Sequence, residues 1–182
     1  MSDDEFFNGQ KVHDFNKSIN VGKEAEGTFE NLLKSYDMKY ESNVNSGNAH
    51  PYDYLVYFRD IQVKVEIKND ARALDTGNLA FEVKSSNSKS GWFIEPRADI
   101  YIVYVGKSIY AMHRVDFKYI RERNCHKLDR LRTVVNKGYT SIVLTVPRAE
   151  LERYKANDED HLIRIMWGMV KNHHFRPIIK AE

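Results

Sequence analysis

Two acidic residues and a lysine in the first half of the sequence have the types and the spacing needed to handle a metal ion or a phosphate. Asp53 begins the β-rich run 53–58, and Glu66 and Lys68 lie near the end of the run 61–68, in which apolar and polar residues alternate. Two such runs separated by two residues are typical of a β-hairpin. If the hairpin turns symmetrically, Asp53 lies directly across from Glu66, and Lys68 projects from the same face.

Two carboxylates that face each other on a sheet predict a bound cation. Facing residues have Cβ atoms about 4.5–5.5 Å apart, and at that distance like charges repel unless a cation lies between them. Oxygen ligands with open positions suit Mg²⁺, and Mn²⁺ is expected to substitute for it. The sequence therefore predicts a magnesium site at Asp53 and Glu66, with Lys68 reaching the same pocket.

A third acid can come from a helix expected over residues 22–36. Its apolar residues recur at helical spacing, at Ala25, Phe29, Leu32, Leu33 and Tyr36. Glu26 borders this stripe and can lean into a site at the edge of the sheet, whereas Glu30 is the weaker alternative. The choice between the two stays open at this point.

The remaining pattern predicts a sheet flanked by helices. Apolar or alternating runs indicate strands at 79–83 and 99–105, a short edge strand at 108–112, a strand at 141–146, and helices at 115–122 and 158–171. The first 20 residues are expected to form an arm. The fold class that follows is α/β or α+β.

Three short motifs carry a resemblance to a known superfamily. In chain order they are Gly22-Lys-Glu-Ala-Glu26, Pro51-Tyr-Asp53 and Glu66-Ile-Lys68. Together they resemble the PD-(D/E)XK nucleases, particularly the small phage and archaeal Holliday-junction resolvases and phage endonucleases, with homing-type members among them. The resemblance covers roughly residues 20–105, and it departs from the usual motif in that proline stands two residues before Asp53.

The resemblance implies a restriction-endonuclease-like core, with a central mixed sheet of four to five strands flanked by helices. It also implies Mg²⁺-dependent hydrolysis of phosphodiester bonds in DNA. Asp53 and Glu66 would then hold the metal, together with the backbone carbonyl of Ile67, and Glu26 would anchor a second metal or its waters. Lys68 would orient the attacking hydroxide and offset charge on the phosphoryl oxygens.

Charge is distributed unevenly along the chain. Residues 1–106 hold 12 Lys and Arg against 17 Asp and Glu, and the remainder is net positive. The segment 113–137 is the most basic part, and we interpret it as a phosphate-binding surface in preference to an ordinary solvated face. Its candidate contacts are Arg114, Lys118, Arg121, Arg123, Lys127, Arg130 and Arg132.

Further candidate DNA contacts lie nearer the acidic residues. Gln62 and Lys64 share a strand face with Glu66 and either touch the DNA backbone or are simply solvated. The loop 85–92, with Lys84 just before it, holds Lys89 and ends in Trp92, which could stack on an unpaired base, although a role as a core plug is favoured. Glu82 could support the site from a neighbouring strand or lie at the surface.

Length and composition limit the classes of protein that remain. The 182 residues, 42% of them hydrophobic, suffice for a single nuclease domain over 1–182, comprising the arm 1–20, a catalytic core over 21–112 and a basic part over 113–182. One cysteine excludes an internal disulfide framework. No run is apolar enough to cross a membrane and no secretory signal is recognisable, so a cytoplasmic location and no membrane partner are expected, and the resemblance suggests a phage protein in a bacterial host.

Two hypotheses from different classes follow. The first is an Mg²⁺-dependent endonuclease acting on double-stranded or branched DNA, site-specific or junction-resolving, and a homodimer or higher homo-oligomer because two strands must be cut. The second is a non-catalytic nucleic-acid-binding module with the same basic surface. Cleavage of plasmid DNA in Mg²⁺ separates the two.

Overall fold

The computed structural model describes residues 15–44, 51–85, 89–124, 126–136 and 139–172. Residues 1–14 of the arm expected over 1–20, and parts of the loops at 45–50 and 86–88, lie outside these residues, as does Lys137 of the basic segment, whereas residues 15–20 belong to a helix. Within the part that is described, no helix is long and apolar enough to cross a membrane.

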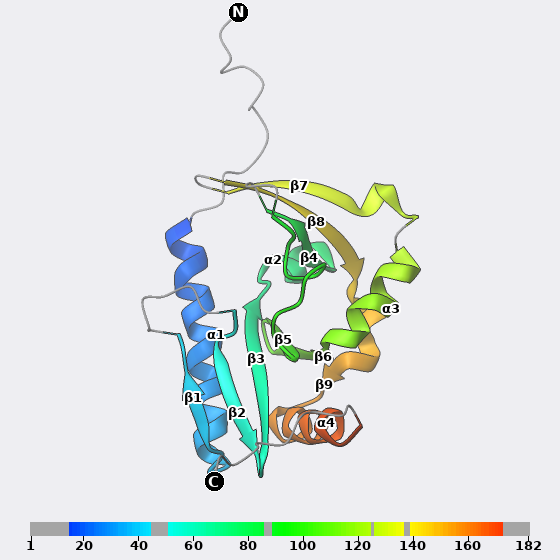
Figure 1. Ribbon diagram of the computed structural model, residues 1–182. Coiled ribbons are helices and arrows are strands. Elements are labelled where there is room, and N and C mark those ends of the chain that lie inside the picture. The colour runs from blue at the N-terminus through cyan, green and yellow to red at the C-terminus, as the bar shows by residue number, and fades with distance from the viewer. Residues whose placement is uncertain (1–14, 45–50, 86–88, 125, 137–138, 173–182) are drawn as a thin grey trace, which may run out of the picture.

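The main sheet has six strands in the order β1-β2-β3-β5-β6-β9 (Figure 1). The β3–β5 pair is parallel and the other pairs are antiparallel, so the sheet is mixed. The strands are β1 (Tyr40–Ser42), β2 (Tyr54–Phe58), β3 (Ile61–Asn69), β5 (Ile100–Val105), β6 (Ser108–His113) and β9 (Lys155–Ala156).

A second, antiparallel sheet of three strands has the order β4-β8-β7. Its strands are β4 (Asn78–Lys84), β8 (Tyr139–Pro147) and β7 (Leu131–Asn136). The helices are α1 (Phe15–Ser35), α2 (Arg72–Thr76), α3 (Arg114–Asn124) and α4 (Glu159–Asn172), with short 3₁₀ turns η2 (Leu128–Arg130) and η3 (Arg148–Tyr154).

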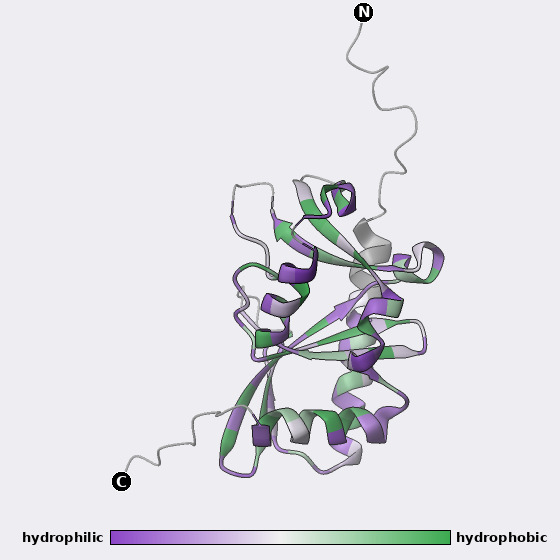
Figure 2. Ribbon diagram, turned by 90° about the vertical axis from the view of Figure 1, so that its right-hand side faces the viewer, coloured by the Kyte–Doolittle hydropathy of each residue, from purple (hydrophilic) through white to green (hydrophobic). Residues whose placement is uncertain are grey.

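One face of the main sheet packs against α1 and α4. Period-two alternation turns Val63, Val65 and Ile67 of β3 toward this face, where they are buried with Phe29 of α1 and Met166 of α4. Figure 2 shows hydrophobic and hydrophilic residues alternating along the helices and strands, as expected for elements that bury one side. This core holds α1 beside the β2–β3 hairpin.

The opposite face is covered only in part. Over β5 and β6, Tyr101, Val103 and Met112 are buried with Phe117 of α3 and Phe81 of β4. The same face of β3 carries polar side chains. The second sheet and α3 therefore cover one half of this face and leave the hairpin half open to solvent.

The mixed sheet flanked by helices confirms the predicted fold class, with six strands where four to five were expected. The helix predicted over 22–36 is α1, which begins earlier and ends at Ser35; Tyr36, assigned to its buried stripe, is 41% exposed. The strand expected at 108–112 is not at an edge, because β9 pairs with its outer side. The strand expected at 79–83 belongs to the second sheet, where it pairs with β8.

Glycine is required at position 91 by a close approach of two backbone segments. A Cβ at Gly91 would lie 2.2 Å from the carbonyl oxygen of Glu82, whereas a Cβ at Gly168, inside α4, would meet nothing within 4 Å. We expect Gly91→Ala to destabilise the fold by about 1–3 kcal/mol through overpacking. The matched change Gly168→Ala should instead stabilise it by about 0.5–1 kcal/mol, because alanine favours the helix. Urea unfolding of both variants checks this pair, and a stable Gly91→Ala protein would contradict the packing described.

Candidate active site

The β2–β3 hairpin brings the predicted acidic residues together. Phe58 pairs with Ile61 across the turn and Tyr54 pairs with Val65, which is the register expected from symmetric turning. The paired residues end at Tyr54, and Asp53 lies directly before it in the chain, beside Val65 and Ile67 of β3. The turn is tight enough that Arg59 adopts a positive φ of 56°.

Asp53 is held at the backbone of β3 by two hydrogen bonds. Its N–H donates to the carbonyl of Val65 at 3.0 Å, and its Oδ2 accepts from the N–H of Ile67 at 2.7 Å. Burial raises the pKa of Asp53, and the Ile67 N–H and the charge of Lys68 only partly offset this effect. The carboxylate is thus fixed in position and poorly hydrated.

Glu66 and Lys68 form an ion pair on the face of β3 that also carries Gln62 and Lys64. Burial raises the pKa of Glu66; the charge of Lys68 lowers it and that of Asp53 raises it further. For Lys68, burial opposes the charge, but the charges of Glu66 and Asp53 raise its pKa on balance. Lys68 therefore stays an ammonium that serves as the counter-ion for two acids.

Glu26 is the helix acid that shares this environment. Its backbone carbonyl accepts a hydrogen bond from the Tyr54 hydroxyl at 2.9 Å, which ties α1 to the start of β2. Burial and then the charge of Asp53 raise the pKa of Glu26, while Lys68 and Lys23 lower it. Glu30, the alternative acid, pairs with Lys34 and accepts from Tyr40 instead.

The donor atoms at this site are oxygens, which is the ligand type that hard divalent cations prefer. Asp53 Oδ2 and Glu66 Oε1 are engaged, but each carboxylate has a second oxygen, and the carbonyl of Ile67 points to the same side of β3 as its N–H, toward Asp53. In the side-chain positions described, no three His, Cys, Asp or Glu residues are grouped closely enough to hold a metal. The ammonium of Lys68 neutralises Glu66 in this arrangement.

No protein-family model matches the chain, and no curated protein matches it. Among solved structures, the chain is similar to a bacterial homing endonuclease, I-Ssp6803I, with a TM-score of 0.44 and 18% sequence identity. The match covers 55% of this chain and 71% of that chain. At this level of similarity, the activity has to be inferred from the geometry of the site itself.

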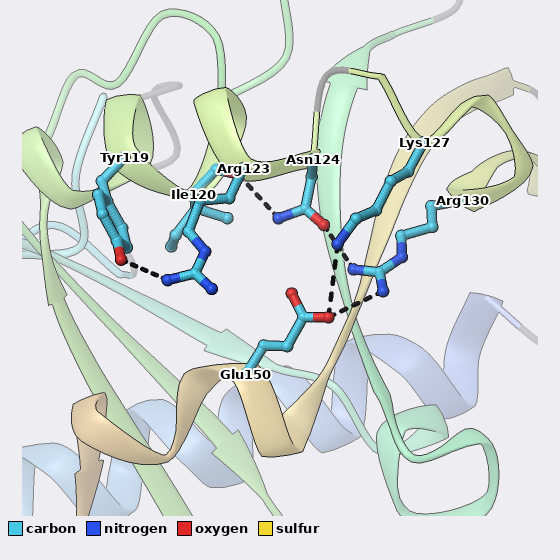
Figure 3. Close-up of polar contacts among 7 residues, drawn as sticks. All are labelled: Tyr119, Ile120, Arg123, Asn124, Lys127, Arg130 and Glu150. Atoms are coloured by element: carbon cyan, nitrogen blue, oxygen red, sulfur yellow. Dashed lines mark hydrogen bonds and ion pairs between the residues drawn. The ribbon is translucent and has the colours of Figure 1, made fainter.

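Some cations of the basic segment 113–137 make structural contacts, and the others are exposed. Lys127 and Arg130 both pair with Glu150 of η3, at 3.7 and 2.8 Å, and Arg130 also contacts Asn124 (Figure 3). Arg121 donates to the carbonyl oxygens of Phe93 and Ile94. These three cations hold α3, η2 and the 91–97 loop in place.

The other cations of that segment are exposed on α3 and β7. Asp99 accepts the N–H of Lys64 at 3.0 Å and pairs with Arg114 at 3.5 Å, so the start of α3 lies beside β3. Further along are Lys118, which pairs with Glu122, Arg123, which contacts Tyr119, and Arg132, which donates to main-chain carbonyls of η2 and β7.

Outside the basic segment, the other candidate contacts are placed as follows. Lys84, Lys89 and Gln62 are all exposed, and Gln62 lies on β3. The Lys64 ammonium lies 5.4 Å from the centre of the Tyr52 ring. Trp92 stacks on Tyr101, with ring centres 5.3 Å apart, and packs against the buried cluster that contains Phe81 and Phe117.

Two features of the site had no usable signal in the sequence. Tyr52 contacts Lys64 as described, and Ser141 donates to Glu82 across the second sheet at 2.7 Å. The first joins Tyr52, just before β2, to β3, and no motif marked it. The second depends on a pairing of strands about sixty residues apart, which no local pattern reveals.

The raised pKa values give a sign for the pH dependence of stability. As the pH rises above the ordinary pKa of 3.8 for Asp53 and 4.5 for Glu66, these two groups keep their protons longer in the folded state than in the unfolded state. Their effect is therefore to lower the free energy of unfolding as the pH rises. Without divalent cations, Asp53→Asn should therefore be more stable than wild type at neutral pH, by about 0.5–2 kcal/mol.

The matched control for this experiment is Glu30→Gln. Hydrogen bonds from Lys34 and then Tyr40 lower the pKa of Glu30, so its removal should not stabilise the protein. Urea unfolding at several pH values measures both variants. An Asp53→Asn protein that is less stable than wild type at neutral pH would contradict the described environment.

Proposed function

We propose that this protein is a Mg²⁺-dependent DNA endonuclease that hydrolyses phosphodiester bonds. The observation that carries the proposal is the juxtaposition of Asp53, Glu66 and Lys68 at β3, where Asp53 accepts from the N–H of Ile67 and Lys68 pairs with Glu66, with both acids poorly hydrated and Lys68 kept charged. Perturbed acids beside a lysine at an open sheet face are typical of catalytic sites.

The residues take the following roles. Asp53, Glu66 and the carbonyl of Ile67 would hold the cation, and Glu26 would anchor a second cation or bound waters. A bound Mg²⁺ supplies polarisation of the scissile phosphate and a lowered pKa for a bound water. Lys68 would give up its ion pair with Glu66. It would then orient the attacking water and offset the negative charge that develops on the phosphoryl oxygens.

The route for DNA follows the half of the sheet that is open to solvent. Lys64 and Gln62 lie on the catalytic face, and Arg114 continues it toward α3, where Lys118 and Arg123 are exposed. Contacts of this type bind phosphates without reading sequence. Lys127 and Arg130, which pair with Glu150, contribute less to such binding.

The substrate in this proposal is double-stranded or branched DNA in the cytoplasm. Site-specific cutting of homing type and junction resolution both need two strand breaks, and a homodimer is the simplest assembly that supplies two sites. Cleavage assays in which four-way junctions compete with long random duplex show which of the two substrates the protein prefers.

Nicking of supercoiled plasmid in Mg²⁺ tests the activity. We expect Lys68→Ala and Asp53→Ala to lower the single-turnover rate by about 10²–10³-fold, because each removes a charge from the site where charge develops. Lys107→Ala, an exposed lysine at the β5–β6 turn, should leave the rate unchanged. DNA binding by the wild type without Mg²⁺- or Mn²⁺-dependent cleavage would instead favour a binding module.

The salt dependence of DNA binding tests the route. Lys118 and Lys34 are both exposed and each pairs with a glutamate four residues away, but Lys34 lies on α1. Removal of Lys118 should weaken binding to all sequences and reduce the slope of log K against log salt by about one. Lys34→Ala should leave the slope unchanged, and equal effects of the two changes would contradict the route.

A further inference from the structure

A small cavity adjoins the candidate active site from the side of the second sheet. Its volume is about 290 Å³, and Lys68 forms part of its lining. The rest of the lining is Ala80, Glu82, Trp92, Val134, Ser141 and Val143. All of these belong to the second sheet except Trp92, which lies in a segment that hydrogen-bonds to β4.

The walls of the cavity differ in chemistry. Val134 and Val143 supply apolar surface, and Trp92 supplies an aromatic ring that is already stacked on Tyr101. Ser141 is only 3% exposed, and its hydroxyl donates to Oε1 of Glu82 at 2.7 Å. That bond does not use Oε2 of Glu82, so the wall formed by Glu82 and Ser141 presents hydrogen-bond acceptors.

Trp92 is positioned by tight packing against β4. The N–H of Gly91 donates to the carbonyl of Val83 at 2.9 Å, and that of Phe93 donates to the carbonyl of Glu82 at 3.1 Å. As described above, any residue larger than glycine at position 91 would collide with Glu82. The aromatic and the acidic walls are therefore fixed relative to each other.

We propose that this cavity binds one unpaired DNA base carrying an exocyclic amino group, immediately beside the phosphate that is cleaved. The volume is sufficient for a single base. An aromatic ring is a general platform for a base, and a carboxylate accepts from an amino group such as N4 of cytosine. Lys68 belongs to both sites, so the base and its phosphate can be held together.

This inference rests on the proposed endonuclease function and narrows its substrate class. Extrusion of a base from a duplex costs a few kcal/mol, and this cost is smallest at mismatches, bulges and branch points. The enzyme should therefore prefer DNA with an unpaired nucleotide at the cleaved position over fully paired duplex.

Trp92 fluorescence provides a binding readout that does not depend on turnover. The chain has two tryptophans, so Trp167→Phe leaves Trp92 as the only one. In this background, without divalent cations, the probes are a duplex with one unpaired cytosine, the same duplex with unpaired pyrimidin-2-one, which lacks the amino group, and a fully paired duplex. Free deoxycytidine monophosphate is the fourth probe.

We expect unpaired cytosine to change Trp92 fluorescence and to bind about tenfold more tightly than pyrimidin-2-one, which is the effect of one hydrogen bond to a charged acceptor. Glu82→Gln and Ser141→Ala should reduce this ratio to near one. Glu95→Gln, an exposed acid in the 91–97 loop, should keep it. Thermal melting of each variant verifies that it is folded.

Equal affinity of wild type for cytosine and pyrimidin-2-one would overturn the base site, and so would tighter binding of the free nucleotide than of the DNA. In either case, Mg²⁺-dependent cleavage of plasmid that requires Asp53 would leave the endonuclease function standing. Selective binding of unpaired cytosine without cleavage of any DNA would support the base site and count against the endonuclease.

Discussion

The register of the β2–β3 hairpin determines which side chains meet at the candidate site. With Phe58 opposite Ile61, one face of the hairpin is buried against α1 and α4, and the other receives Asp53, Glu66 and Lys68. A slip of one residue would exchange the two faces of a strand and bury Lys64 and Glu66 in the core. Burial of the apolar residues of β3 therefore fixes the register that places the polar residues on the opposite face.

Burial of the two acids of the site opposes folding, as is common at functional sites. Asp53 and Glu66 lose hydration, and only Lys68 and the N–H of Ile67 compensate for it. The surrounding structure can support this cost because the strand carrying Glu66 lies between β2 and β5, well inside the main sheet. A divalent cation would relieve the repulsion between the acids and release Lys68 for other contacts.

The elements nearest the site were largely predictable from the sequence, because they depend on local patterns. Alternation in residues 61–68 and the two-residue separation determined the hairpin, and helical spacing from Ala25 to Leu33 determined α1. The second sheet was not predictable: β4 pairs with β8 some sixty residues later, and nothing local distinguishes this from pairing within the main sheet. Charge counting identified the basic segment but not which cations are engaged, since Glu150, the partner of Lys127 and Arg130, lies beyond it in sequence.

The most direct test of the account asks where a divalent cation binds. Backbone amide signals of the 21.3 kDa protein can be followed by NMR during a titration with Mn²⁺, which broadens signals near its binding site. The account predicts that Asp53, Glu66 and Ile67 broaden first, and that Glu66→Gln abolishes this selectivity. An acidic stretch at 158–160 lies at the start of α4 and provides the internal comparison. Broadening that begins there, and is the same in Glu66→Gln, would contradict the central claim.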